Sequence, residues 1–150
     1  MIPKGAAGID HLATRMVTGL LPKAADAYMA ADIGLLAGLV RLVAQDFDRA
    51  AEVLMSDIEA AAAIFREAAP HVDDEVLKRR MADAAASRPP GLRIETLNAH
   101  ADVAVRVLID LHAAVEEARD AGAGWAPALD RTLWAFLDAY VAKRAYDSAF

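Results

Sequence analysis

Two aspartates, Asp46 and Asp57, lie on an otherwise apolar strip of a long predicted helix. At about 100° per residue they fall within about 20° of each other, but about 16 Å apart along the helix axis. That separation is too large for the two carboxylates to share a metal ion or a proton. An intrahelical ion pair with Arg49 accounts for Asp46. Alternatively, one of the two acids lines a polar pocket or pairs across an interface.

His112 could serve acid–base or metal chemistry, because Glu116 follows it by four residues on the same predicted helix. A histidine and a carboxylate at this spacing can hold a proton or a metal ion. The alternative is a histidine at the edge of the core that bonds to a nearby carboxylate. His100 is about 120° away around the helix, so the two imidazoles cannot converge on one ligand.

The last predicted helix carries an apolar stripe that ends at Tyr140, and Arg144 continues its line. Such a stripe is typical of core, and the alternative is a wall for a flat or acyl ligand. We expect the Arg144 head group to reach water past the end of the bundle. Alternatively, Arg144 and the Tyr140 hydroxyl face Asp46 or Asp57 and form a polar spot in the core. The candidate ligand-binding residues are therefore Asp46, Asp57, His112, Tyr140 and Arg144, and the stripe before Tyr140 consists of Leu129, Leu133, Phe136 and Leu137.

Known catalytic motifs are not found in the sequence. There is no pair of Glu-x-x-His motifs for a ferritin-like di-metal site, no glycine-rich phosphate loop, no Gly-x-Ser-x-Gly elbow and no His-Glu-x-x-His. The absence of cysteine removes thiolate metal sites and cysteine catalysis. We therefore assign no catalytic residue, metal ligand or cofactor.

The elements that must position these residues are helical. The 150 residues include 37 alanines, nine aromatic residues and 57% hydrophobic residues, a composition that favours helix.

The net charge of −6 argues against nucleic acid binding. The composition, rich in alanine and arginine, is associated with bacterial genomes of high GC content. No signal peptide is visible, and the longest uncharged stretch on the long central segment, 33–40, is shorter than the ~18 residues of a membrane span. We expect a cytoplasmic protein without integral membrane association.

Prolines, glycines and capping residues predict one domain, an all-α antiparallel helical bundle. Asp10 is the predicted cap of the first helix, and Asp73 or Asp74 that of the fourth. Gly34 and Gly38 allow either a break in the longest helix or a close helix crossing there. The three main helices are predicted at about 31–68, 93–121 and 126–146, and the shorter ones at about 10–21, 22–29 and 74–86.

The longest predicted helix has two apolar surfaces. One is the core stripe, and the other is a flanking strip that a single neighbouring helix would not cover. A helix of 38 residues would be ~57 Å long, whereas a compact chain of this size is ~38 Å across. Other helices of the bundle could cover the strip, but an elongated bundle favours pairing with a second copy. The core stripe is Leu36, Val43, Phe47, Ala50, Leu54, Ile58, Ala61 and Phe65; the predicted homodimer contact is Leu35, Leu39, Leu42, Val53 and Ile64.

These observations favour a non-enzymatic interaction or regulatory module. The alternative is a small-molecule-binding bundle or an enzyme with a cleft between the long helices, lined by Tyr140, His112 and aromatic residues of the last helix. The two hypotheses differ in one observable feature, which is a pocket between the helices.

Overall fold

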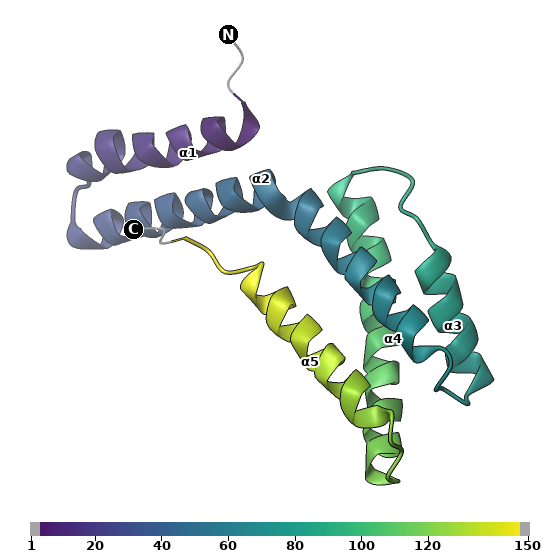
Figure 1. The fold of residues 1–150 in the computed structure, drawn as a ribbon. Coiled ribbons are helices and arrows are strands. Elements are labelled where there is room, and N and C mark those ends of the chain that lie inside the picture. Colours follow the sequence, from purple (N-terminus) through teal and green to yellow (C-terminus); the bar gives the residue numbers. More distant parts are fainter. Residues whose placement is uncertain (1–3, 148–150) are drawn as a thin grey trace. The chain divides into compact units, whose positions relative to one another are not determined.

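The computed structural model describes residues 4–147, which form helices joined by short turns (Figure 1). No strand occurs between residues 4 and 147, so the predicted all-α class is confirmed. The antiparallel arrangement of the whole chain stays a prediction. The α-helices are α1 (Gly5–Arg15), α2 (Ala27–Ala68), α3 (Glu75–Ala86), α4 (Ile94–Asp120) and α5 (Ala126–Ala142).

The chain divides into two compact units. Within the described residues, the N-terminal unit comprises 4–50 and 145–147, and the C-terminal unit comprises 51–144. In the N-terminal unit α1 lies beside the first part of α2 (Figure 1). In the C-terminal unit α4 packs against both α3 and α5. The single-domain organisation stays a prediction, because α2 contributes residues to both units.

The first helix differs from the prediction at both ends. It begins at Gly5, so Asp10 lies inside α1 instead of capping it, and the Asp10 carboxylate is 3.7 Å from Nε of Arg41. A π-helical turn, Met16–Leu20, and a 3₁₀ turn, Leu21–Lys23, follow α1. The predicted bounds of the helices at 10–21 and 22–29 are therefore wrong, because Pro22 lies inside a single 3₁₀ turn that begins at Leu21.

Helix α2 begins four residues before the predicted position, at Ala27. Oδ1 of Asp26 accepts a hydrogen bond of 2.8 Å from the Met29 N–H, which is the geometry of an N-cap. From there the helix continues through Gly34 and Gly38 without interruption. The alternative of a broken helix near these glycines is wrong.

The next two helices agree with the predicted 74–86 and 93–121 to within one residue at each end. Asp74 caps α3 by accepting from the N–H groups of Val76 and Leu77. Helix α4 ends in a Schellman motif, in which the Gly122 N–H bonds to the Arg119 carbonyl and the Ala123 N–H to the Ala118 carbonyl. Gly122 has φ +84°, a conformation that favours glycine.

Helix α5 ends at Ala142 instead of the predicted 146. Ala145 and Asp147, a few residues further along, are bound by side chains of α2 within the N-terminal unit. Arg49 donates a hydrogen bond of 2.6 Å to the Ala145 carbonyl, and the Asp147 N–H donates to Oε1 of Gln45 at 3.0 Å. These side chains satisfy backbone groups that have no partner within α5.

The predicted core stripe of α2 is half right. Its second part, from Leu54 to Phe65, is buried, but Leu36, Val43 and Phe47 are exposed. In the N-terminal unit the buried side of α2 instead carries Ala37 and Ala44. This side faces α1, as the Asp10–Arg41 pair shows. Alanine allows two helices to approach closely, so the smaller side chains take the interior position.

Candidate functional site

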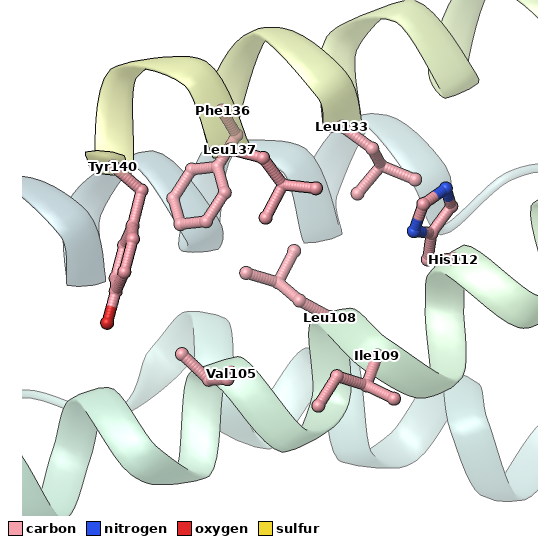
Figure 2. A pocket seen from close by; sticks show the side chains of 8 residues that line it. All are labelled: Val105, Leu108, Ile109, His112, Leu133, Phe136, Leu137 and Tyr140. Carbon is pink, nitrogen blue, oxygen red and sulfur yellow. The ribbon is translucent and has the colours of Figure 1, made fainter. Parts of the chain in front are cut away.

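A half-open groove runs between α4 and α5 in the C-terminal unit (Figure 2). Its cavity volume is about 260 Å³. Leu108 and Leu133 are buried, while Ile109 and Leu137 are exposed. Figure 2 shows His112 at one end of the groove and Tyr140 at the other. The lining residues are Val105, Leu108, Ile109, His112, Leu133, Phe136, Leu137 and Tyr140.

Two matched helical stripes build this groove. The α4 residues and the α5 residues each follow the spacing i, i+3, i+4 and i+7, so each set lies on one helix face. Leu129 and Leu133 of the predicted α5 stripe are buried, as expected for core. Phe136, Leu137 and Tyr140 instead form a wall of the groove. The cleft of the alternative hypothesis is therefore present; its ligand stays a prediction.

His112 lies among acidic and aromatic side chains. Its Nε2 is 3.5 Å from Oδ1 of Asp130 and 3.9 Å from Oε1 of Glu116. The His112 and Trp134 rings meet edge to face, with centroids 5.6 Å apart. Neither Nε2 of His112 nor Oδ1 of Asp130 has a hydrogen-bond partner, although both atoms are buried. The His112–Glu116 proximity predicted from the spacing is present, and Asp130 of α5 is the nearer acid.

The other oxygen of Asp130 binds Arg119. The Arg119 guanidinium donates a hydrogen bond of 2.9 Å to Oδ2 of Asp130 and lies 3.6 Å from the Asp120 carboxylate. The hydrogen bond to Asp130 raises the pKa of Arg119, which therefore stays charged. The two acids beside His112, Asp130 and Glu116, therefore outnumber the cation Arg119, which pairs with Asp130.

The Tyr140 end lies beside a buried polar cluster. Asp57 is 4% exposed, and its carboxylate contacts Nζ of Lys143 at 3.0 Å and Arg144 at 2.7 Å. Lys143 also donates to Oγ of Ser56. The Arg144 guanidinium lies 3.5 Å from the centroid of the Tyr140 ring. The expectation that Arg144 reaches past the bundle to water is wrong, and the alternative pairing of Arg144 with Asp57 is confirmed. The predicted contact of the Tyr140 hydroxyl with an acid stays a prediction.

Asp46 is not part of this cluster. It belongs to the N-terminal unit, where its carboxylate is 3.6 Å from Arg49 and accepts a hydrogen bond of 2.6 Å from the Tyr146 hydroxyl. This hydrogen bond raises the pKa of Tyr146. The predicted Asp46–Arg49 pair is confirmed.

A second candidate surface is an exposed apolar face on α2 in the N-terminal unit. Leu35 and Leu39 are 58% and 49% exposed, whereas Leu42 and Val53 are half-buried. Ile64 lies in the core of the C-terminal unit, so its place in the predicted dimer contact is wrong. We call the exposed side chains the N-terminal apolar face; they are Tyr28, Met29, Leu35, Leu36, Leu39, Val43 and Phe47.

Helix α2 is also long and apolar enough to cross a membrane, the one such helix within residues 4–147. Its most apolar window of 18 residues has a mean hydropathy of 1.6, and 17% of that window is buried. Core helices of soluble proteins pass the same test of length and composition, but such helices are mostly buried. The absence of integral membrane association stays a prediction.

The sequence interpretation missed Asp130 and Lys143. Asp130 precedes Trp134 by four residues, so its side of α5 could have been inferred from spacing. Lys143 meets Asp57 across 86 residues of chain, and no local pattern reveals such a contact.

Known proteins give no further guidance, because comparison of the chain with family models, curated proteins and solved structures finds no match. Within residues 4–147, no three histidine or acidic side chains are placed to hold a metal ion. The groove can therefore be assessed only by its own chemistry, which is that of an apolar channel with one imidazole and one phenol.

Proposed function

We propose that this protein is a self-associating interaction module and that two copies meet through the N-terminal apolar face. The observation that carries this proposal is the exposure of Leu35, Leu36, Leu39 and Val43 on one side of α2. Large contiguous apolar patches are uncommon on the surface of monomeric proteins and mark contact sites. A face repeated on two identical copies suits a two-fold contact.

Charge supports a second copy over a lipid surface as the occupant. Residues 4–50 contain five basic and five acidic side chains, so the unit has no positive excess to attract anionic lipids. Asp32 is exposed and falls on the same helical face as Leu39 and Val43. A carboxylate is costly within hydrocarbon, whereas a protein contact can leave it at a hydrated rim.

Sedimentation equilibrium of the full chain tests the proposal. We expect a dimer at micromolar concentration, and we expect Leu39→Asp to weaken it at least tenfold because the contact would bury an unpaired charge. Val76→Asp is the matched control, since Val76 is an exposed valine of α3 outside the face. A wild-type monomer at micromolar concentration would overturn the proposal, as would equal dissociation constants for wild type and Leu39→Asp.

Disulfide crosslinking locates the contact independently. The chain has no cysteine, so each introduced thiol is the only one. Leu36→Cys or Leu39→Cys should form an interchain disulfide if the residue lies near the two-fold axis, because the Cα atoms must come within about 7 Å. Asp48→Cys, exposed on another side of α2, should not. If vesicles bind the wild-type protein and Leu39→Asp abolishes that binding without any dimer, the face is a lipid contact and the proposal is wrong.

A further inference from the structure

We infer that the groove between α4 and α5 binds a hydrophobic amine, with its hydrocarbon part along the leucine-lined channel and its ammonium group at His112. Three features of the groove carry this inference. They are the size of the apolar channel, the direction of the imidazole and the charge at the His112 end.

The channel matches a hydrocarbon of moderate length. Its volume of about 260 Å³ exceeds the ~150 Å³ of an apolar cavity that admits benzene. The α4 lining extends from Val105 to His112, which is about 10 Å along the helix axis. An extended chain advances a little over 1 Å per carbon, so about eight carbons fit.

The imidazole presents an acceptor to the channel. Nε2 of His112 faces the carboxylates of Asp130 and Glu116, which favour the tautomer with its proton on Nε2. Figure 2 shows a ring nitrogen of His112 on the groove side, and because Nε2 faces the acids, that nitrogen is Nδ1. In this tautomer Nδ1 accepts hydrogen bonds. The matching ligand group is a donor.

The charge at this end favours a cation. Asp130 and Glu116, the two acids placed beside His112, outnumber Arg119, which pairs with Asp130. Towards Tyr140, two cations, Lys143 and Arg144, share the single carboxylate of Asp57. The negative excess is thus at the imidazole, where an ammonium group both donates to Nδ1 and meets opposite charge.

Isothermal titration calorimetry with alkylamines tests the inference. We expect octylamine to bind at one site per chain and at least tenfold more tightly than octanoate or octanol. From hexylamine upward, each methylene should strengthen binding about fourfold until the chain reaches about eight carbons, after which the gain should stop. Equal affinities for octylamine and octanoate, or no octylamine binding at millimolar concentration, would overturn it.

Variants test the apolar channel and the ammonium position at His112 separately. Leu137→Trp fills the channel and should abolish octylamine binding, whereas Val76→Trp, at an exposed position of α3, should leave it unchanged. His112→Phe keeps a ring against Trp134 but removes the acceptor, so the affinity for octylamine should fall to that for octanol. Glu116→Gln removes only a half-exposed charge and should weaken octylamine binding several-fold without unfolding the chain. Unchanged octylamine affinity in Leu137→Trp and Glu116→Gln contradicts the inference, whatever the folding of His112→Phe.

Discussion

Arg144 and Asp57 form an ion pair of 2.7 Å in which the aspartate side chain is 5% exposed. The contact joins the second residue after the C-terminal end of α5 to the last third of α2, 87 residues earlier. Lys143 reaches the other oxygen of the same carboxylate. The buried acid is therefore held by two cations from one turn.

Asp57→Asn is expected to lower the free energy of unfolding by about 2 kcal/mol, because it leaves both cations without their counter-charge. This is less than the ~3–5 kcal/mol of a fully buried pair, since Lys143 and Arg144 are about one-third exposed and can regain water. Urea unfolding measures the change. Asp110→Asn is the control: its pair with Arg80 is nearly half exposed and should contribute less than ~1 kcal/mol. Equal losses in the two variants would contradict the prediction.

Leu111→Ala should destabilise the C-terminal unit by about 3 kcal/mol, because Leu111 is fully buried and its truncation leaves a cavity in the core. Ile109→Ala on the same helix removes a side chain that is 62% exposed and should cost under ~1 kcal/mol. Chemical unfolding followed by circular dichroism compares the two. If Ile109→Ala lowers the free energy of unfolding as much as Leu111→Ala does, the Ile109 side chain is buried in solution and the prediction is wrong.

Gly122→Ala should cost about 1 kcal/mol of unfolding free energy, because φ +84° places the added methyl group in the unfavourable left-handed region. Gly124→Ala is the matched control, since Gly124 has negative φ and open space around its Cα. The difference in thermal unfolding midpoint between these variants measures how much a non-glycine residue at this positive φ destabilises the fold. Equal midpoints would mean that the Schellman turn rearranges at no cost.

Tyr146 should ionise above its ordinary pKa of about 10, because its hydroxyl donates a hydrogen bond to the Asp46 carboxylate. A raised pKa in the folded state means that this bond stabilises the fold below about pH 10 and that its contribution disappears as the pH rises through the raised pKa. Tyrosinate absorbance, compared with that of Tyr146→Phe, isolates this titration. Asp46→Asn should lower the Tyr146 pKa and Asp48→Asn should not; an unchanged titration in Asp46→Asn would exclude the hydrogen bond as the cause.

Helix boundaries were predictable where they depend on residues that are close together in the sequence. The prediction of Asp73 or Asp74 as a cap placed the start of α3 to within one residue, since a capping side chain acts over a few bonds. The start of α1 was missed because Asp10 resembles a cap, while its actual role is an ion pair with Arg41 of α2. The end of α5 was missed because Gln45 and Arg49 bind the next residues from far along the sequence.

The candidate site was only partly predictable for a related reason. Periodicity placed His112 and Tyr140 each on a definite face of its helix, and the structure brings those faces together in one groove. Periodicity cannot say what covers a face. Leu36 and Val43 follow the same period as Leu54 and Ile58, yet the first two are exposed and the last two are buried.

Both tryptophans of the chain lie against a histidine ring: Trp125 stacks on His71 with centroids 5.1 Å apart, and Trp134 meets His112 edge to face. Because Trp134 lies at the His112 end of the groove, its emission should change when a ligand occupies that end.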